Sequence, residues 1–398
     1  MRYNFRLFFR LFYWSVFKSK GTHGRLTPHR RKALFWWFVI IPTHNFFTWL
    51  AFLLDEVLFR EYRDQEVKAP IFIIGNFRSG STLLQRLMVK DEDHFTAMRT
   101  WEIYGAPSIS QRKFLKWFGR IDASLFKGRL RRFLYQMEES SLNNIPMHRV
   151  ALHEVDEDEG ILLHNWTSSF LMFIFPFMEV LPPYLHFDAE MSEREKNMSM
   201  EFYYRMVQKH VYFHGGRQYI AKNPAFSSKV HALREYFPDA KFIYLVRNPV
   251  DMLASKTSFF TYIWRVFNDP LEPYPFKEML LNLTRRWYVE TLKTLEELPN
   301  SEYVILKYGD LVSELDASTR LLFDHFGISI NDRFEKKLCD AVRTADSYVS
   351  NHKYSLFELG YTADQVYNQY REIFDRFEFD LNGKALMAQV SKKSAEID

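Results

Sequence analysis

The most informative stretch of the chain runs Pro70-Ile71-Phe72-Ile73-Ile74-Gly75-Asn76-Phe77-Arg78-Ser79-Gly80-Ser81-Thr82-Leu83-Leu84. Its short apolar run after a proline predicts a buried strand, and the apolar residues that follow the second glycine predict a helix. Glycines let the turn between them curl so that several backbone N–H groups point inward, and the helix N-terminus adds its positive end to the same anion. The stretch therefore predicts a strand, a phosphate-binding loop and a helix.

The loop is close to the Walker A pattern of proteins that bind nucleoside triphosphates, with four residues between Gly75 and Gly80. Ser81 stands where that pattern needs the lysine that reaches the β- and γ-phosphates. The basic residue, Arg78, lies inside the loop instead. Such a loop suits a single phosphate better than a triphosphate chain with Mg²⁺. Gly-rich turns between a strand and a helix are also common without any ligand, so the loop needs a second motif to support it.

Composition limits the class of protein. A length of 398 residues allows one large α/β domain or two smaller ones. The aromatic content of 18% is high and predicts a large core, an apolar substrate groove or a membrane-facing surface. The single cysteine, Cys339, excludes an intrachain disulfide and fits a reducing, cytoplasmic compartment. No Cys/His cluster has the spacing of a zinc site, so the sequence predicts no metal.

The net charge of +4 hides an asymmetry along the chain. Residues 1–32 contain nine Arg or Lys and no acidic residue, while the remaining chain carries 44 basic and 49 acidic residues. The body of the protein is therefore acidic, which argues against nucleic acid as a partner. The basic N-terminus predicts an electrostatic contact with a membrane surface.

Residues 1–68 form a predicted membrane-associating segment. Between residues 4 and 17, aromatic and aliphatic residues are interrupted by arginine, a pattern typical of an interfacial helix. Residues 33–54 carry no charge, and a bilayer-spanning helix needs about 20 apolar residues. Pro42 interrupts this run, so a re-entrant or interfacial helical pair fits as well as a single kinked span. The alternative is a pair of helices packed on the globular domain, and no signal-peptide cleavage pattern is present.

Residues 69–390 form one predicted domain in which apolar strands alternate with helices. The predicted strands lie at 71–74, 219–221, 241–246 and 303–307. Strands separated by helices form right-handed crossovers, which predicts an α/β, P-loop-like three-layer fold with a central, mostly parallel sheet. Between Trp101 and Gly216 only helical patterns occur, at residues 111–118, 129–139, 158–164 and 193–214. They predict a helical insertion over the substrate side.

A second motif follows the strand at 241–246. Arg247 ends this strand, Asn248-Pro249 begins a helix, and Ser255 lies about two helical turns further along. Ligands of parallel sheets bind at the carboxyl ends of the strands, so Arg247 belongs to the same edge as the loop that contains Arg78. A long arginine and a helix hydroxyl can bind one further anion from two sides.

Together the two motifs resemble those of sulfotransferases that use 3′-phosphoadenosine 5′-phosphosulfate (PAPS). The loop from Gly75 to Thr82 is similar to their 5′-phosphosulfate loop, and Arg247 with Ser255 is similar to their 3′-phosphate motif. Further similarity lies in Tyr219-Ile220-Ala221-Lys222-Asn223-Pro224 and in Ile305-Leu306-Lys307-Tyr308-Gly309-Asp310-Leu311. The resemblance covers residues 69–380 and is strongest to the branch of tyrosylprotein and bacterial sulfotransferases.

The resemblance implies a set of cofactor-binding residues. Those expected at the 5′-phosphosulfate are Arg78, Ser79, Gly80, Ser81 and Thr82. Arg247 and Ser255 are expected at the 3′-phosphate, and Tyr308 is expected beside the nucleotide. His352 and Lys353 are similar to a late basic segment that closes over the cofactor.

Sulfuryl transfer needs a base that takes the proton of the acceptor and cations that stabilise the charge on the leaving phosphate. Arg78 and Lys222 are the candidate cations. In the tyrosylprotein branch the base is a glutamate soon after the first helix, and the resemblance places Glu102 there. The competing cluster is His153 with the acidic run at 154–159, because crowded carboxylates acquire raised pKa values when they are buried. A solvated acidic turn is the structural alternative for this cluster.

The resemblance predicts PAPS-dependent transfer of a sulfuryl group to a hydroxyl or amine. A small-molecule kinase shares the fold, but neither the Walker lysine nor a strand-end aspartate for Mg²⁺ is present. A membrane adaptor without activity is a third alternative. The aromatic insertion and the N-terminus favour a lipid acceptor over a glycan. Triplets of the glycosylation type at Asn165, Asn197 and Asn282 would fit a Golgi location, but the sequence favours a cytoplasmic protein associated with a membrane through its N-terminus.

Overall fold

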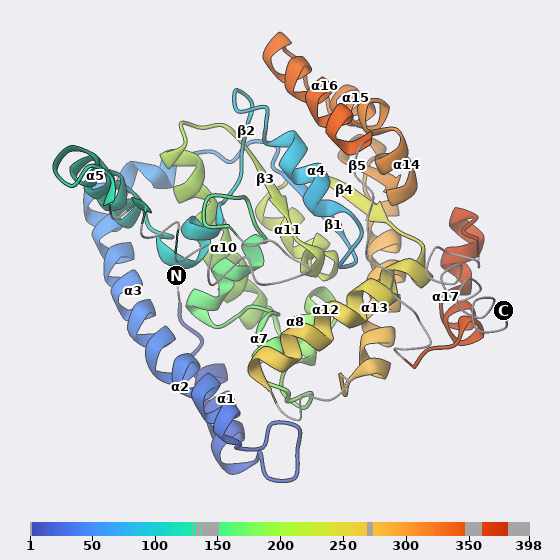
Figure 1. The fold of residues 1–398 in the computed structure, drawn as a ribbon, viewed down its shortest axis with the longest axis horizontal. Helices are drawn as coiled ribbons and strands as arrows, with labels where there is room; N and C mark the ends of the chain where they lie inside the picture. Colours follow the sequence, from blue (N-terminus) through green and yellow to red (C-terminus); the bar gives the residue numbers. More distant parts are fainter. Residues whose placement is uncertain are drawn as a thin grey trace.

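The computed structural model describes residues 2–129, 131, 132, 136, 151–268, 274–346 and 360–380. At its centre lies a parallel sheet in the strand order β2-β3-β1-β4-β5 (Figure 1). In chain order the strands are β1 (Ile71–Gly75), β2 (Phe95–Thr96), β3 (Gln218–Lys222), β4 (Lys241–Val246) and β5 (Tyr303–Lys307). The four strands predicted from the sequence are confirmed. The additional strand, β2, has two residues and is too short to produce an apolar pattern.

β1 occupies the middle of the sheet, and all of its residues are buried. Ile71 pairs with Ile220 of β3 on one side, and β4 pairs with β1 on the other. Side chains of a strand alternate between its two faces. Ile71 and Ile73 belong to one apolar cluster, whereas Phe72 and Ile74 belong to the other. The uninterrupted apolar run of the sequence is explained by a strand that is buried on both faces.

Helices cover both faces of the sheet. The cluster that contains Ile71 also contains residues of α4 (Ser81–Met88), α14 (Tyr308–Ser313), α15 (Leu315–His325) and α16 (Asp332–Asp346). The cluster that contains Phe72 includes residues of α10 (Glu193–Phe213), α11 (Val230–Tyr236), α12 (Pro249–Phe267), α13 (Lys277–Glu296) and α17 (Ala363–Phe377). The predicted α/β, three-layer fold is confirmed.

In the described residues between β2 and β3 the regular elements are helical, as the sequence predicts. They are the π-helical turn η3 (Trp101–Gly105), α5 (Ile109–Leu125), the 3-10 helix η4 (Asp158–Asn165), α7 (Leu171–Ile174), α8 (Pro182–Leu185), α9 (Phe187–Glu190) and α10. A capping box formed by Ser108 and Gln111 begins α5. The predicted helix at 129–139 falls largely outside the described residues, so it stays a prediction.

The N-terminus forms α1 and then a continuous helix of 31 residues. The elements are α1 (Phe5–Phe17), α2 (Pro28–Phe35), the π-helical turn η1 (Trp36–Ile40), α3 (Ile41–Leu58) and the 3-10 helix η2 (Arg60–Asp64). Among the described residues, the helix from Pro28 to Leu58 is long and apolar enough to cross a membrane, by length and composition alone. Buried helices of globular proteins pass the same test, so its contacts must decide its role.

Pro42 does not end this helix. The π-helical turn before it pairs the N–H of Ile41 with the carbonyl of Trp36. Just after the proline, the hydroxyl of Thr43 donates a hydrogen bond to the carbonyl of Val39 at 2.7 Å. The π-helical turn directly precedes the proline, so the helix continues through it with a local distortion. The helical pair weighed for residues 33–54 is therefore replaced by a single helix.

The inner face of α3 packs on the globular domain. Its buried residues are Asn45, Thr48, Phe52 and Asp55. Asp55 accepts hydrogen bonds from the backbone N–H groups of Ile109 and Ser110 at 3.0 and 2.8 Å, so it holds the start of α5. Its Oδ2 also lies 2.8 Å from Lys209 Nζ of α10 in a fully buried ion pair. The division of the chain at residue 68 stays a prediction, and residues on either side of it share this buried interface.

Asp55→Ala should lower the free energy of unfolding by about 3–5 kcal/mol, because it leaves the buried Lys209 ammonium without its nearest carboxylate. Glu66→Ala is the control: it removes the exposed partner of Lys68 and should change stability by less than about 0.5 kcal/mol. Urea denaturation followed by circular dichroism measures both variants. Equal midpoints would show that the Asp55–Lys209 pair does not anchor the N-terminal helix.

Candidate active site

The loop between β1 and α4 owes its shape to three residues with positive φ: Gly75 (140°), Arg78 (69°) and Gly80 (87°). Glycine adopts such angles readily, but they are unfavourable for other residues, so Arg78 must be held by its surroundings. A Cβ at Gly80 would lie 2.5 Å from the Tyr308 ring, and a Cβ at Gly75 would collide with the carbonyl of Leu245 in β4. Both glycines are therefore needed for the loop to fit against its neighbours.

Buried polar side chains fix the first half of the loop. Ser227 Oγ accepts a hydrogen bond from the Gly75 N–H and donates one to the Gly75 carbonyl, both at 3.0 Å. Asn76 donates to the Thr284 carbonyl at 3.3 Å, and Lys256 Nζ donates to Asn76 Oδ1 at 3.3 Å. Burial lowers the pKa of Lys256 to about 7. A buried network of this kind makes the loop rigid.

Residues from two other strand ends converge on Arg78. Its Nε donates a hydrogen bond to Ser255 Oγ of α12 at 3.0 Å, and Arg247 Nη1 donates to its carbonyl at 2.6 Å. The Arg247 guanidinium in turn lies over the Tyr308 ring, 4.6 Å from its centroid. Asn248 directs the chain from β4 into α12 as its N-cap. The structure thus brings the two sequence motifs to one edge of the sheet.

We call Arg78–Thr82, Arg247, Ser255 and Tyr308 the phosphate cradle. Two of its buried polar atoms, Ser79 Oγ and Arg247 Nε, have no hydrogen-bond partner among the described residues. A hydroxyl and a guanidinium N–H both bind phosphate oxygens well. The N-terminus of α4, which begins at Ser81, adds partial positive charge. This set of donors fits a nucleotide that carries anionic groups at two separate points.

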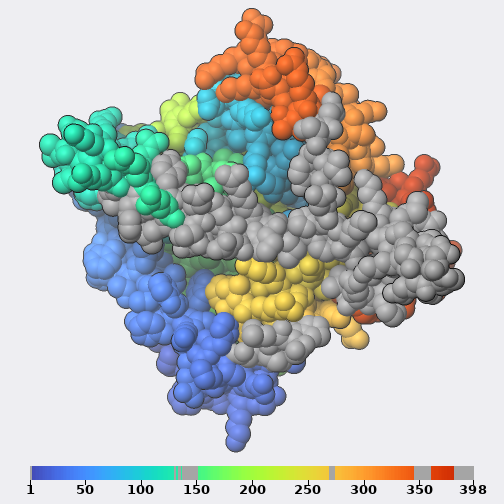
Figure 2. Space-filling view, viewed as in Figure 1, coloured from blue at the N-terminus to red at the C-terminus, as the bar shows by residue number. Residues whose placement is uncertain are grey.

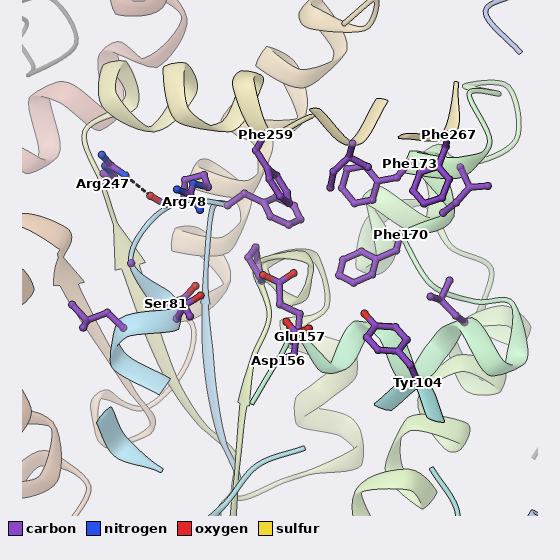
Figure 3. A pocket seen from close by; sticks show the side chains of 18 of the residues that line it. Arg78, Ser81, Tyr104, Asp156, Glu157, Phe170, Phe173, Arg247, Phe259 and Phe267 are labelled. Carbon is purple, nitrogen blue, oxygen red and sulfur yellow. Dashed lines mark hydrogen bonds between the residues drawn. The ribbon is translucent and has the colours of Figure 1, made fainter. Parts of the chain in front are cut away.

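A cavity of about 520 Å³ extends from the phosphate cradle (Figure 3). Its opposite end, which we call the aromatic chamber, is lined by Trp37, Tyr104, Phe170, Phe173, Phe259 and Phe267. These side chains come from the N-terminal helix, the helical insertion and α12. Cavities of this size hold drug-sized ligands. The cavity therefore joins a site for charged groups to a site for an apolar molecule.

Asp156 and Glu157 lie between the two ends of the cavity (Figure 3). Lys222 Nζ, at the carboxyl end of β3, lies 2.8 Å from Glu157 Oε1. Asp156 Oδ1 accepts a hydrogen bond from the Glu157 N–H at 2.8 Å. A carboxylate that lines a cavity beside an anion-binding loop can take a proton from a bound substrate. Both residues belong to the acidic run at 154–159 that the sequence offered as the competing source of the base.

The next two carboxylates of this run are structural. Asp158 is buried and accepts hydrogen bonds from the hydroxyl of Tyr219, at 2.7 Å, and from that of Tyr203. Burial raises the pKa of Asp158 to about 6, against the effect of these bonds. Glu159 forms a fully buried ion pair with Lys229 at 2.5 Å. The acidic run is therefore anchored on both buried carboxylates and is not a solvated turn.

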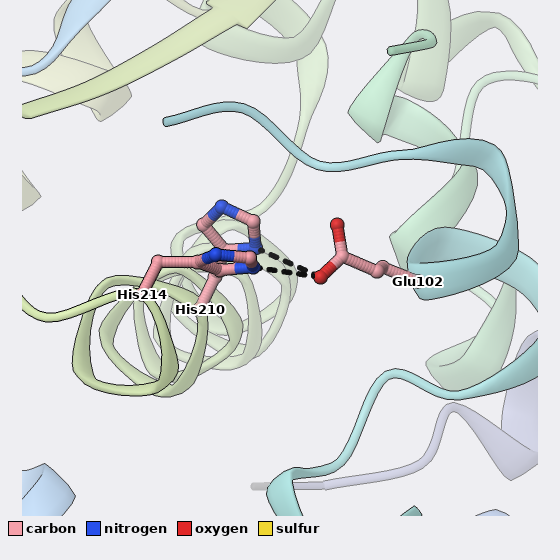
Figure 4. Close-up of side chains that lie close together, drawn as sticks. All are labelled: Glu102, His210 and His214. Atoms are coloured by element: carbon pink, nitrogen blue, oxygen red, sulfur yellow. Dashed lines mark hydrogen bonds and ion pairs between the residues drawn. The ribbon is translucent and has the colours of Figure 1, made fainter. Parts of the chain in front are cut away.

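Glu102 lies apart from the phosphate cradle. It is buried in η3 and is not one of the described residues that line the cavity. Its Oε1 lies 2.8 Å from His214 Nε2 and 3.9 Å from His210 Nδ1 (Figure 4). The same oxygen lies 3.5 Å from Arg112 Nη1. Burial would raise the pKa of Glu102, but the neighbouring charges hold it below its ordinary value. A carboxylate enclosed in this way is poorly placed to take a proton from a bound acceptor.

Glu102, His210 and His214 also form a described cluster that could hold a metal ion, since their donor atoms lie within 4.8 Å of one another. Their other contacts argue against an ion. Arg112 Nη1 lies 3.1 Å from His210 Nδ1, and Thr96 Oγ1 lies 2.8 Å from His210 Nε2. The Arg112 guanidinium thus supplies the positive charge, and a metal ion would be repelled by a fixed cation beside it.

The remaining predicted residues lie away from the cavity or outside the described part of the chain. His153 is exposed, and its backbone carbonyl accepts a hydrogen bond from Arg99 at 3.0 Å. His352 and Lys353 lie outside the described residues. The residues of the aromatic chamber were not predicted from the sequence. The high aromatic content was the available signal, but a composition does not identify which aromatic residues line a cavity.

The sequence is similar to that of known sulfotransferases. A sequence model of the sulfotransferase family matches residues 70–332. An omega-hydroxy-beta-dihydromenaquinone-9 sulfotransferase of Mycobacterium bovis is 26% identical over 322 residues, which cover 78% of this chain and 75% of that protein. The protein of the same name from Mycobacterium tuberculosis matches to the same extent.

Two solved structures share the fold. Sulfotransferase STF9 from Mycobacterium avium aligns with a TM-score of 0.71 at 17% identity, over 90% of this chain and 88% of that one. Sulfotransferase STF1 from Mycobacterium tuberculosis H37Rv aligns with a TM-score of 0.67 at 17% identity, over 92% of each chain. Because the family match runs from β1 to the start of α16 and spans more than half of the chain, this protein belongs to the sulfotransferase family.

Proposed function

We propose that this sulfotransferase moves a sulfuryl group from PAPS to a hydroxyl group of an apolar, lipid acceptor. The observation that carries the proposal is the cavity that joins the phosphate cradle to the aromatic chamber. Membership of the family implies PAPS as the donor. The comparisons lend no support to the kinase alternative.

PAPS supplies the sulfuryl group, and the phosphate cradle offers a place for each of its charged ends. Arg78, Ser79 and the N-terminus of α4 would hold the 5′-phosphosulfate. Arg247 and Ser255 would hold the 3′-phosphate, with Tyr308 beside the nucleotide. The buried atoms Ser79 Oγ and Arg247 Nε support this division, because each is a donor without a partner among the described residues. The fixed charge of Arg78 would stabilise negative charge on the transferring group.

We assign the general base to Glu157 and not to Glu102. Glu157 lines the cavity, whereas Glu102 is enclosed by Arg112 and two histidines. In this assignment Glu157 would take the proton of the acceptor hydroxyl while that oxygen bonds to sulfur. The bond between sulfur and the bridging phosphate oxygen of PAPS would break in the same step, and adenosine 3′,5′-bisphosphate would leave. Lys222 is a positioning residue, since its ammonium holds Glu157 Oε1 at 2.8 Å.

The aromatic chamber supports a lipid acceptor. Its lining of aromatic rings buries apolar surface well but offers few hydrogen bonds to a glycan. The mycobacterial relative is named for a hydroxylated menaquinone, which belongs to the same class of apolar acceptor. We therefore infer an acceptor with an apolar body in the chamber and a hydroxyl group at Glu157.

A lipid acceptor requires contact with a membrane, and residues 1–60 are proposed to provide it on the cytoplasmic side. The phenylalanines of α1 that are exposed are Phe5, Phe9, Phe12 and Phe17. Residues 1–32 add nine basic residues and no acidic one. Exposed aromatic residues with basic neighbours are the composition of an interfacial helix.

Incubation of the full chain with labelled PAPS and with lipid, glycan and protein extracts of the host tests the acceptor class. Label should enter the lipid extract, because the aromatic chamber favours an apolar molecule. Separation of the extracts by solvent partition and chromatography measures the distribution of label. Label confined to glycan or protein would contradict the proposal.

Adenosine 3′,5′-bisphosphate should bind at least about tenfold more tightly than AMP, because a charge-assisted hydrogen bond contributes about 1.5–3 kcal/mol and each 1.4 kcal/mol is a tenfold change. Arg247→Ala should remove most of this preference. It should weaken binding of the bisphosphate by about tenfold more than binding of AMP, because loss of the hydrogen bond to the Arg78 carbonyl affects both nucleotides, whereas only the bisphosphate loses a contact with its 3′-phosphate. Arg265→Ala, at an exposed position of α12, is the matched control. Calorimetry without added Mg²⁺ measures all affinities. Equal affinity of the unmodified protein for both nucleotides would contradict the assigned 3′-phosphate site.

Glu157→Gln should lower kcat/KM by roughly 10²–10⁴-fold, because glutamine keeps the shape of glutamate but cannot take the proton. Its affinity for adenosine 3′,5′-bisphosphate should stay nearly unchanged. Glu102→Gln should mainly lower the melting temperature, since it removes the carboxylate that faces the buried Arg112.

Two measurements on each variant separate the two roles. One is the transfer of label to the extract that accepts it from the unmodified protein, and the other is the melting temperature. If Glu102→Gln abolished transfer at an unchanged melting temperature while Glu157→Gln stayed active, the assignment of the base to Glu157 would be wrong.

A further inference from the structure

Helix α5 carries its large apolar side chains on the surface. Phe114, Leu115, Trp117, Phe118 and Leu125 are all exposed, with exposed fractions of 57% for Phe114 and 53% for Trp117. The spacing of 114, 117, 118 and 125 places these residues along one stripe of the helix. The rings of Phe114 and Phe118 stack, with their centroids 6.2 Å apart. A helix of a soluble domain would turn such a stripe toward the core.

Two exposed lysines of α5 lie beside this stripe, with their ammonium groups over aromatic rings of neighbouring elements. Lys113 Nζ lies 4.0 Å from the ring centroid of Phe59, and Lys116 Nζ lies 4.2 Å from that of Phe213. Residues 109–129 contain six basic residues and one acidic residue, which is buried. The helix therefore presents an apolar outer stripe bordered by positive charge, the arrangement of an interfacial membrane helix.

The exposed apolar surface continues along the N-terminal helices. α1, η1 and α3 follow one edge of the molecule in Figure 1, and α5 lies at the far end of α3, which it contacts. In Figure 2 the same elements, blue and teal, lie along that side of the surface. We call their exposed apolar residues the apolar edge. Examples are Phe9, Phe12, Trp36, Phe46, Leu50 and Leu53.

The contacts of the opposite face of α3 show how this helix can meet a membrane. Asn45 Oδ1 lies 2.8 Å from His164 Nδ1, and Asp55 pairs with the buried Lys209. If the helix crossed a bilayer, these polar contacts and the domain attached to them would enter the hydrocarbon core, where no water is available. If it lies along the interface, the outer face enters the lipid and every inner contact is kept.

We propose that the apolar edge is a monotopic docking surface for an anionic lipid bilayer, with α5 as a second membrane contact beside the N-terminal helices. The exposed basic residues of α5, which are Lys113, Lys116 and Arg120, and the exposed basic residues of 1–32 complement anionic headgroups. Trp37 of the aromatic chamber is adjacent to the exposed Trp36 on η1, so the chamber lies beside the docked surface. Docking does not depend on the donor or the base, and only its use in acceptor delivery rests on the proposed function.

Co-sedimentation of the full chain with phosphatidylcholine vesicles, with and without phosphatidylglycerol, tests the docking surface. The double variant Phe114→Ser/Trp117→Ser should weaken binding to the anionic vesicles by about tenfold or more, because burial of one large apolar side chain is worth at least one factor of ten. The matched control is Val312→Ser/Leu321→Ser, at exposed apolar positions of α14 and α15. Unchanged circular dichroism spectra and melting temperatures show that both variants are folded.

Equal vesicle binding by the two double variants would overturn the role of α5. A change of oligomeric state with unchanged vesicle binding would do so as well, since it would make the apolar edge a contact between copies of the chain. Binding independent of phosphatidylglycerol would exclude the electrostatic part of the proposal. None of these outcomes depends on transfer activity, so they are distinguishable from failure of the proposed function.

The orientation is tested with single cysteines at Lys20 and Arg60, which are exposed near the two ends of the N-terminal helix, in a Cys339→Ser background. In sealed vesicles that carry the full chain on their outer surface, a membrane-impermeant maleimide should label both positions. Protection of one position until detergent is added would show a spanning helix and overturn monotopic docking.

Discussion

The site depends on the hydrogen bond from Arg247 to the carbonyl of Arg78. A left-handed backbone is unfavourable at an arginine, so the loop keeps this shape only while its neighbours hold it. Ser255 holds the side chain of the same arginine, and Tyr308 closes the edge against Gly80. Because these contacts come from three strand ends, the phosphate cradle exists only when the central sheet has formed. A local loop alone could not present the same donors to an anion.

Two buried carboxylates fix the position of Glu157 in the cavity. A buried charge is costly unless it is paired or well hydrogen-bonded: Asp158 accepts hydrogen bonds from two tyrosine hydroxyls, and Glu159 is paired with Lys229. These two residues fix the start of η4, so the preceding residue, Glu157, is held in the cavity within reach of Lys222. The same requirement explains Glu102, which pairs with Arg112 and His214 and is not among the described residues that line the cavity. The carboxylates enclosed by buried partners thus support the fold, whereas Glu157 lines the cavity.

The N-terminal helices and α5 show how packing changes the meaning of an apolar sequence. Length and composition allow the helix from Pro28 to Leu58 to cross a bilayer. Its buried Asp55–Lys209 pair ties one face to the domain, which leaves only the other face for lipid. In α5 the contacts of Lys113 and Lys116 turn the apolar stripe outward. The exposed apolar residues of these helices form the apolar edge, and Trp37 of the aromatic chamber belongs to the helix from Pro28 to Leu58.

The strands, the phosphate loop and the position of Arg247 could be predicted from the sequence because each follows from short-range rules: an apolar run for a buried strand, glycines for a tight turn, and an N-cap with proline for a helix start. Three features could not be predicted: the enclosure of Glu102 by Arg112, the pairing of Glu157 with Lys222, and the assembly of the aromatic chamber from three segments. Such contacts join residues far apart in the chain and leave no local pattern. Composition alone marked the acidic run at 154–159 as rich in carboxylates. Only the tertiary structure decided which of these carboxylates face the cavity. Burial and ion pairing of a carboxylate depend on residues that are distant in the sequence.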